Sequence, residues 1–355
     1  MKFTNKQLLI AGLILGMSFA LAACKKNNEE ETTTKFLSGS LSTGAPAYAF
    51  VGEEITMRYG GLSKEDGDSL LTYIWKISVD DVADTLRKES DPASVAAVKR
   101  FTIPDTLGTF RITVQAIASG YASSSATSDI KFLDNTMDGR GSLSGFVVDP
   151  DKDIYLTDPR DDIEYLCHIT DGQIWMRQNL AYEGTEESGI LGVPYDKEPR
   201  LSRTFGRYYT WEEAVKACPP GWRLPSEKDW VQLASEVIPD AQQKSNFKDV
   251  AGDFLGNIKF NGERMWGYWP NDVTITDRLG FTALPCGIDN VTAEQHNFSH
   301  FGDYAAFWTA DAMEDTPEAL FRYMHSKSKD VFVEYGSTSR LRLNVRCVKD
   351  LEEEE

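Results

Sequence analysis

Four short motifs follow one another in a fixed order along the second half of the chain, and they constrain its fold more than any other feature. They are GQIWMRQNL at residues 172–180, ACPPGWRLPS at 217–226, GFTALP at 280–285 and VRCVKD at 345–350. The second motif places Cys218 directly after a predicted helix, and the fourth places Cys347 in the last predicted strand.

The order and spacing of these motifs resemble the Fibrobacter succinogenes major paralogous domain, a family of secreted and lipid-anchored bacterial proteins with a C-type-lectin-like fold. The resemblance implies an α+β, C-type-lectin-like domain over residues 146–350, followed by an acidic tail at residues 351–355. It implies much about the fold and little about a ligand, because one fold hosts many functions.

The cysteines indicate an oxidising compartment. Apart from Cys24, the four cysteines all lie in the second domain, where they allow three pairings. The family resemblance implies a bridge between Cys218 and Cys347, which would close a loop of about 130 residues and stabilise the fold by about 5 kcal/mol. Cys167 and Cys286 depart from the family pattern, and their joint presence leads to the hypothesis of a second bridge between them. The alternative, a zinc site, lacks any Cys-x-x-Cys pair.

Two helices in the second domain have recognisable start signals. Thr210 with Glu213, and Ser226 with Asp229, have the spacing of capping boxes. Pro219 ends the first helix because proline lacks the backbone donor that a helix needs. Beyond about residue 257, the chain is predicted to form strands and long loops. Four tryptophans are predicted to be core residues, namely Trp175, Trp222, Trp230 and Trp308.

The N-terminus predicts a lipoprotein. Lys2 and Lys6 precede an apolar run at residues 8–20, and the sequence LAAC then ends at Cys24. This is the arrangement of a bacterial lipoprotein signal peptide, so residues 1–23 are predicted to be removed and Cys24 to carry the lipid. The alternatives are an ordinary signal peptide or an anchor helix, although the apolar run is shorter than the roughly 20 residues of a membrane span.

Residues 24–35 are polar and have no periodicity, so they are predicted to form a flexible tether. The acidic triplet at residues 29–31 resembles a signal that directs some lipoproteins to the outer face of the outer membrane. The expected location is therefore the cell envelope, as an outer-membrane lipoprotein exposed at the surface. The chain has 37 basic and 55 acidic residues, a net charge of −18, which excludes nucleic acid as a partner.

Residues 36–135 are predicted to form an all-β sandwich without cysteines. Alternating apolar and polar residues mark strands at 54–59, 71–77, 108–116 and 123–132. The stretch resembles bacterial immunoglobulin-like domains of the polycystic-kidney-disease type, which commonly act as spacers. Residues 136–145, rich in Gly, Ser and Asp, are the predicted linker, and a strand around residues 146–148 is predicted to open the second domain.

The lectin-like resemblance raises the question of a sugar site. Families that bind sugar through calcium use a Trp-Asn-Asp strand, and the similar stretch here, Trp269 to Asp272, is interrupted by a proline. Tyr268 and Trp269 are nevertheless candidates for stacking on a sugar ring, with Asn271 and Asp272 as neighbouring polar groups. The alternative is a plain loop.

A calcium site is the alternative at the acidic turn of residues 149–153, because clustered carboxylates suit that ion. A simple hairpin turn is the favoured interpretation there. No metal and no cofactor are predicted for this chain.

An enzymatic alternative rests on residues 223–227 (RLPSE) and Trp230, which resemble a signature of formylglycine-generating enzymes. Those enzymes hold copper through two cysteines near the C-terminus, whereas this chain has only Cys347 there. Nucleophile, phosphate-loop and metalloprotease motifs are also lacking. The prediction is that the protein is not an enzyme.

The leading functional hypothesis is a lipid-anchored envelope protein that presents a lectin-like binding domain to glycan or protein ligands, in adhesion or in association with a fimbria. Loops at residues 257–276 and 289–304 are expected to carry specificity. The second hypothesis is a structural component of an envelope assembly without a soluble ligand, and the third is a catalyst of the formylglycine-generating type.

Overall fold

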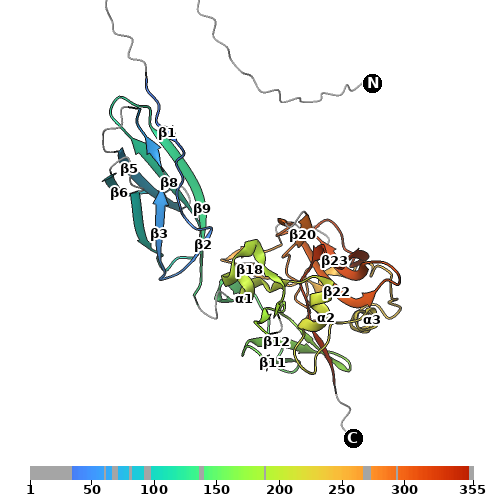
Figure 1. The fold of residues 1–355 in the computed structure, drawn as a ribbon. Helices are drawn as coiled ribbons and strands as arrows, with labels where there is room; N and C mark the ends of the chain where they lie inside the picture. The colour runs from blue at the N-terminus through green and yellow to red at the C-terminus, as the bar shows by residue number, and fades with distance from the viewer. Residues whose placement is uncertain are drawn as a thin grey trace, which may run out of the picture.

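The chain forms an elongated all-β part, residues 34–135, and a larger mixed part, residues 140–351 (Figure 1). This computed structural model describes residues 34–59, 61–65, 71–79, 82–91, 97–135, 140–187, 189–266, 273–292 and 295–351. Within these residues, none of the helices is long and apolar enough to cross a membrane. The two parts are called the first part and the second part below.

The first part consists of two main β-sheets around one core. Its five-stranded sheet has the order β2 (Tyr48–Phe50), β9 (Ser124–Leu133), β8 (Gly108–Ile117), β5 (Leu71–Val79) and β6 (Val82–Asp91). A second sheet pairs β3 (Glu54–Tyr59) with β7 (Ala97–Thr102), and a short one pairs β1 (Ser38–Gly39) with β4 (Leu62–Ser63). Strands β2 and β9 run parallel, while the other pairs are antiparallel.

The alternation of buried and exposed side chains along the strands explains why the two sheets share one core. In β8 the side chains of Phe110, Ile112 and Val114 are buried, and each is followed by a more exposed residue. They share a hydrophobic core with Ile55 and Met57 of β3, on the other main sheet. The predicted all-β class and its four predicted strands are therefore confirmed.

The second part contains several small antiparallel sheets. The first has the order β11 (Asp153–Thr157), β12 (Glu164–Ile169), β13 (Gln173–Met176) and β26 (Val348–Asp350), so the last strand pairs with one of the first. Two others are β22 (Tyr304–Ala312), β23 (Glu318–His325), β24 (Phe332–Ser337), and β21 (Gln295–Ser299), β20 (Ile288–Thr292), β25 (Leu341–Arg342). The shortest strands are β10 (Leu143–Ser144), β18 (Lys259–Phe260), β19 (Glu263–Arg264), β14 (Gly184–Thr185), β15 (Gly189–Ile190), β16 (Val193–Pro194) and β17 (Arg207–Tyr208).

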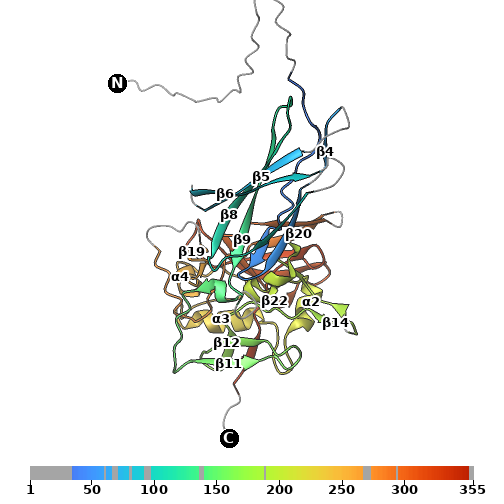
Figure 2. The ribbon, with the colours of Figure 1, turned by 90° about the vertical axis from the view of Figure 1, so that its left-hand side faces the viewer.

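Both predicted helices begin at their capping boxes. Helix α2 (Trp211–Ala217) starts after Thr210, and α3 (Glu227–Ser235) starts after Ser226, with both reciprocal hydrogen bonds of each box present. Figure 2 shows both helices above the β11–β12 pair. Four shorter elements were not predicted, because three or four residues are too few to show a helical period: η2 (Tyr195–Lys197), η3 (Pro199–Leu201), α1 (Ser202–Phe205) and α4 (Ala251–Phe254).

The two parts meet in a shared hydrophobic cluster. Tyr48 and Leu133 of the first part are buried against Phe205 of the second part, together with several neighbours. Arg200 reinforces this joint, because its guanidinium donates to a carboxylate oxygen of Glu53 at 3.0 Å and to the carbonyl oxygen of Tyr48 at 2.9 Å. Strand β10, which lies within the expected linker, pairs with β18 of the second part. The joint is therefore a packed interface.

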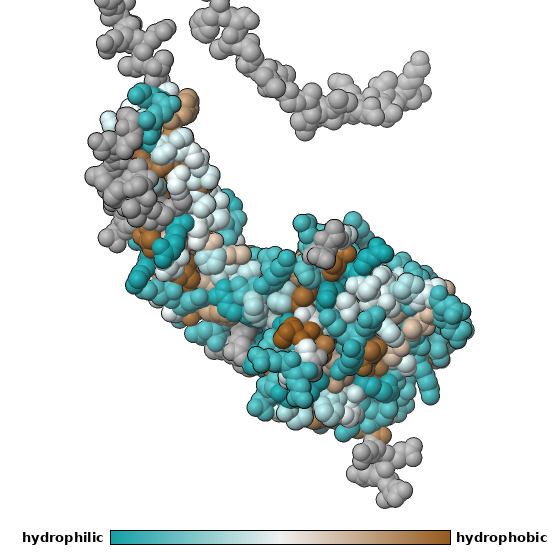
Figure 3. Space-filling view, viewed as in Figure 1, coloured by the Kyte–Doolittle hydropathy of each residue, from teal (hydrophilic) through white to brown (hydrophobic). Residues whose placement is uncertain are grey.

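Apolar side chains are thinly spread over the surface. Figure 3 shows a mostly hydrophilic face with small, separate hydrophobic patches on both parts. Single exposed apolar residues of this kind are normal on a folded protein and do not by themselves mark a binding site. The polar cavities of the second part are therefore the stronger candidates for a functional site.

Candidate functional site

The motif residues come together first of all as a scaffold. One buried carboxylate, that of Asp229, accepts from Gln173 Nε2 at 2.7 Å and from Arg223 Nη2 at 2.8 Å. Arg223 also donates to Asp350 Oδ1 at 2.7 Å, so the first, second and fourth motifs are joined. Burial by itself raises the pKa of Asp229, but the hydrogen bonds from Arg223 and Ser226 outweigh it and lower the pKa to about 2.

Arg346 connects the third motif to the others. Its guanidinium is fully buried and donates to the carbonyl oxygens of Met176 at 3.0 Å, Phe281 at 2.7 Å and Thr282 at 3.0 Å. A fourth bond reaches Asn179 Oδ1 at 2.7 Å. The loop carbonyls are thus satisfied by a side chain in place of a neighbouring strand.

The motif tryptophans pack into the core as predicted. Trp175, Trp230 and Trp308 are fully buried, and the rings of Trp175 and Trp230 meet edge to face with centroids 5.6 Å apart. Trp222 is only partly buried, against the edge of the core that contains Trp308. The prediction is confirmed for three of these residues and holds in part for Trp222.

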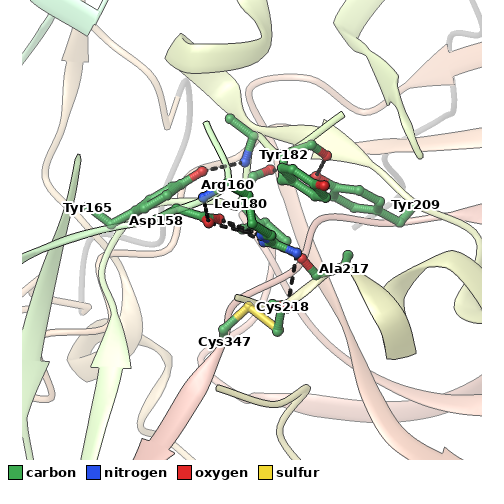
Figure 4. The surroundings of a disulfide bond; sticks show 10 residues. Asp158, Arg160, Tyr165, Leu180, Tyr182, Tyr209, Ala217, Cys218 and Cys347 are labelled. Atoms are coloured by element: carbon green, nitrogen blue, oxygen red, sulfur yellow. Dashed lines mark hydrogen bonds and ion pairs between the residues drawn. A yellow bond between two sulfur atoms is a disulfide. The ribbon is translucent and has the colours of Figure 1, made fainter. Parts of the chain in front are cut away.

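The predicted disulfide between Cys218 and Cys347 is present (Figure 4). It joins the end of α2 to the segment before β26, across 129 positions of sequence. Arg160 lies beside it and donates to the carbonyl oxygens of Ala217 at 2.8 Å and Cys218 at 3.2 Å. This cation satisfies the last carbonyls of the helix, where the helix dipole favours positive charge.

The hypothesis of a second bridge between Cys167 and Cys286 is wrong, since both are free thiols. Cys167 points from β12 into the core that contains Trp308, whereas Cys286 lies in the cluster at the joint between the two parts. Each is buried as a small apolar side chain in its own cluster. Burial raises the pKa of both thiols to about 12, which leaves them unreactive at neutral pH.

Five of the predicted site residues lie outside the residues that the structure describes. They are Cys24, Tyr268, Trp269, Asn271 and Asp272. In the expected loop at 289–304, much of the chain forms a regular hairpin of β20 and β21. The expected loop at 257–276 contributes Asn257, Ile275 and Thr276 to the wall of a cavity.

This cavity, the His168 cavity, has a volume of about 380 Å³ and opens in the second part between the chain before β11, strands β12 and β13, and the segment 275–280. Residues 146–148, predicted as a strand, form an irregular segment at its edge, and the carbonyl oxygen of Val147 accepts from Arg177. Its lining residues are Gly145, Val147, Asp149, His168, Arg177, Asn257, Ile275, Thr276, Asp277, Arg278 and Gly280.

His168 is the most constrained group in the wall. Its side chain comes from β12, is only 5% exposed, and places Nδ1 at 2.7 Å from Asp153 Oδ1. A carboxylate only accepts, so Nδ1 carries the hydrogen and Nε2 is left with a lone pair in the neutral ring. Nε2 makes no hydrogen bond with any residue that the structure describes, and the ring lines the cavity.

Arg177 holds the groups around His168 in place. Its guanidinium donates to the second oxygen of Asp153, to Asp277 Oδ2 at 2.9 Å and to Thr282 Oγ1 at 3.0 Å. Asp277 in turn accepts from the backbone nitrogen of Thr282 at 2.7 Å. Burial raises the pKa of Asp277 above its ordinary value, and the bonds from Thr282 and Arg177 oppose this shift.

Gly280 explains one position of the third motif. A Cβ atom there would lie 2.3 Å from Cγ of His168, and the backbone φ is +58°. Only glycine satisfies both conditions, since a side chain would displace the imidazole and a left-handed φ disfavours other residues. The motif glycine is therefore part of the cavity wall.

The cavity is suited to hydrogen bonding and poorly suited to holding a cation. Asp153 has both oxygens committed to His168 and Arg177, and the backbone nitrogen of Asp153 donates to the Asp149 carbonyl oxygen at 2.7 Å, which confirms a turn at 149–153. Across the described residues, the structure contains no group of three or more His, Cys, Asp or Glu side chains arranged for a metal ion.

His168, Asp153 and Arg177 were not predicted as site residues. One signal for them was present, because His168 stands in a strand, EYLCHI, whose neighbouring residues are buried and apolar. A buried imidazole needs a hydrogen-bond partner, and an acidic turn precedes that strand. The pairing itself depends on the register of β11 and β12, in which Asp153 faces His168.

Comparison with known proteins agrees with the motif pattern. The model of one protein family, the Fibrobacter succinogenes major domain, matches residues 170–349, just over half of the chain. The matched range begins just before the first motif and ends within the fourth. None of the curated proteins compared with the chain matches it.

Proposed function

Because this chain belongs to the Fibrobacter succinogenes major domain family, we propose that it is a ligand-binding protein of the cell envelope. In this proposal Cys24 carries a lipid in the outer membrane, residues 24–35 form the tether, and the second part binds a glycan or protein ligand at the cell surface. The role is adhesion or surface recognition, in association with a fimbria.

The proposal assigns an immunoglobulin-like fold to the first part and a C-type-lectin-like fold to the second. Two antiparallel-rich sheets around one apolar core support the first assignment. The second is supported by the pairing of β13 with the terminal strand β26, and by the disulfide that closes most of the second part into one loop. Two short helices beside several small sheets agree with this layout.

The observation that carries the proposal is the His168 cavity. The motif residues Gln173, Arg223 and Arg346 hold the scaffold together, with Asp229 just after the second motif as a shared acceptor. By contrast, the cavity rim includes loop residues such as Asn257 and Ile275, which no motif contains. A fixed scaffold with a loop-built cavity is the usual design of a binding domain.

The first part fits the role of a spacer. Figure 1 shows the described chain entering the first part at the end farthest from the second part. The packed joint at Arg200 and Phe205 then holds the second part at the opposite end. A lipid on Cys24 would in this way keep the cavity away from the membrane surface.

The two alternative functions have weaker support. A copper-dependent catalyst of the formylglycine-generating type needs two free thiolates near the C-terminus, and Cys347 is bound to Cys218. The role of a structural component without a soluble ligand does not account for a polar cavity in which His168 Nε2 has no partner among the described residues.

The test is binding by the full mature chain, produced without its lipid and applied to arrays of glycans and extracellular proteins, with calcium and with EDTA. Selective binding is the expected result. The absence of binding on both arrays contradicts the proposal and favours the structural role. Cross-linking on intact cells then tests whether the protein is part of an envelope assembly. Membrane attachment is tested separately, since Cys24→Ala should move the protein from the membrane fraction to the soluble fraction.

A further inference from the structure

We propose that the His168 cavity receives a neutral, hydroxyl-rich ligand, namely the end of a glycan chain, and that it does so without calcium. This inference rests on the proposed binding function and adds to it the site, the ligand class and the independence from metal. Four observations carry it: an acceptor without a partner among the described residues, guanidinium groups that are already paired, the size and composition of the wall, and carboxylates that are already occupied.

The acceptor is His168 Nε2. Asp153 accepts the hydrogen bond from Nδ1, and Arg177 holds Asp153 in place. The orientation of the imidazole is therefore fixed, and the lone pair of Nε2 points in one direction. His168 is largely buried, but its ring lines the cavity, so a bound ligand can reach Nε2 there. A ligand O–H that donates to Nε2 forms a hydrogen bond in a setting with little competing water.

Both guanidinium groups of the cavity wall are already paired with carboxylates. Arg177 and Arg278 line the cavity together with Asp149 and Asp277. Arg177 is paired with Asp153 and Asp277, and Arg278 is paired with Asp253. Counting these partners, four carboxylates surround two guanidinium groups, so an anionic ligand is disfavoured, whereas a neutral polyol finds both donors and acceptors.

The rest of the wall fits a sugar unit in size and composition. A volume of about 380 Å³ lies within the range of small-molecule sites, ~300–1,000 Å³. Val147 and Ile275 offer apolar surface for the C–H groups of a ring. The exposed side-chain amide of Asn257, which bonds to none of the described residues, adds a donor and an acceptor at the rim.

Independence from calcium follows from the occupied carboxylates. Both oxygens of Asp153 and both of Asp277 accept hydrogen bonds from protein groups. Asp149 Oδ1 accepts from the backbone nitrogen of Asp151 at 3.0 Å. Calcium requires six to eight oxygen ligands, so binding it here would mean breaking the bonds that position His168.

The experiment uses the full mature chain without its lipid, first on a glycan array and then by titration calorimetry with the best-bound oligosaccharide, in EDTA and in calcium. The affinity is expected to be equal in both. His168→Ala should weaken binding at least about tenfold, as expected for the loss of a hydrogen bond to a buried acceptor. Asn257→Trp, which changes an exposed rim residue and leaves the buried network intact, should block the cavity and abolish binding.

The matched control is Val215→Ser, an exposed position on α2 outside the cavity, which should bind as the unaltered protein does. Thermal unfolding of every variant separates loss of the site from loss of the fold. Strong glycan binding that survives both His168→Ala and Asn257→Trp, or that disappears in EDTA, overturns the inference and leaves the proposed binding function standing. If no glycan binds, and the NMR signal of His168 Cε1 does not change when methyl glycosides are added, the inference is overturned. In that case, binding on the array of extracellular proteins decides whether the proposed binding function stands.

Discussion

The two parts of this molecule are stabilised in different ways. The first part has no cysteine, and the ion pair between Arg111 and Asp129 lies on its surface, with side chains 62% and 48% exposed. The second part has a disulfide and the ion pair of Arg322 with Glu227, whose side chains are completely buried. Apolar packing of regular strands dominates one part, whereas the other adds covalent and ionic links inside its core.

The difference follows from where the backbone finds its hydrogen bonds. Long strands such as β8 and β9 satisfy each other, so their inward side chains only need to be apolar. Much of the second part is irregular chain, whose carbonyl groups have no strand partner. Buried arginines donate to these carbonyl oxygens instead. Arg346 donates to the carbonyl oxygen of Phe281, and Arg207 Nη2 donates to that of Gly192 at 3.0 Å. Irregular chain can thus be kept in a core when cations are buried with it.

The largest effect should come from removing the disulfide. In the double variant Cys218→Ser and Cys347→Ser, the free energy of unfolding of the second part should fall by about 5 kcal/mol, because the unfolded chain regains the entropy of an open loop of 129 residues. Guanidinium titration followed by tryptophan fluorescence measures it, since Trp175 and Trp230 report on this part. A reducing agent should have no further effect on the variant, and a loss below about 1 kcal/mol contradicts the prediction.

The buried ion pair should come next. Arg322→Met leaves the carboxylate of Glu227 buried without its cation, which costs about 3–5 kcal/mol. The double variant that adds Glu227→Gln should recover part of this loss, because the buried charge is then gone. Chemical denaturation of the two variants under identical conditions decides the matter. Equal stability of the single variant and the unaltered protein would show that the pair is not a core element.

Acid should weaken the second part through Asp229. Its pKa is lowered from 3.8 to about 2 in the fold, so its stabilisation is fully present above pH 4 and is lost as the pH falls from about 4 to 2. The expected loss is about 2 kcal/mol. Unfolding free energies measured across this range for the unaltered protein and for Asp229→Asn should converge at the acid end. A constant difference between the two would contradict the assignment.

The smallest effect should occur in the first part. Arg111→Ala removes an exposed ion pair with Asp129, so the free energy of unfolding should change by less than about 1 kcal/mol. Added salt should reduce even this difference, because exposed charges are screened. A loss as large as that of Arg322→Met would mean that surface and core ion pairs are equivalent here, and would remove the contrast between the two parts.

Local features of the fold were predictable from the sequence, and long-range ones only in part. The helix starts at Thr210 and Ser226 depend on side chains three residues apart, and the strand at 108–116 depends on alternation, so both can be read locally. The Cys218–Cys347 bridge was predicted through the family resemblance. The bridge between Cys167 and Cys286 was mispredicted, because counting cysteines says nothing about which cluster each thiol enters.

The candidate site was harder to predict than the fold. His168 lies 15 positions from Asp153 along the chain, 9 from Arg177 and 112 from Gly280, so only the folded register brings the four together. The predicted aromatic residues at 268 and 269 lie outside the described chain, and three of the loop positions expected to carry specificity, Asn257, Ile275 and Thr276, line the cavity. The sequence pattern thus pointed to one of the loops that line the cavity, but it did not identify His168.

The parallel pairing of β2 with β9 has a mechanical consequence. If the chain is anchored before residue 34 and a bound ligand pulls on the second part, tension enters β2 from its beginning and leaves β9 at its end. Because the two strands run in the same direction, their three residue pairs, from Tyr48–Lys131 to Phe50–Leu133, are loaded together in shear. Arg200, which ties Tyr48 to the second part, shares that load. The link between anchor and cavity therefore resists being peeled apart one hydrogen bond at a time.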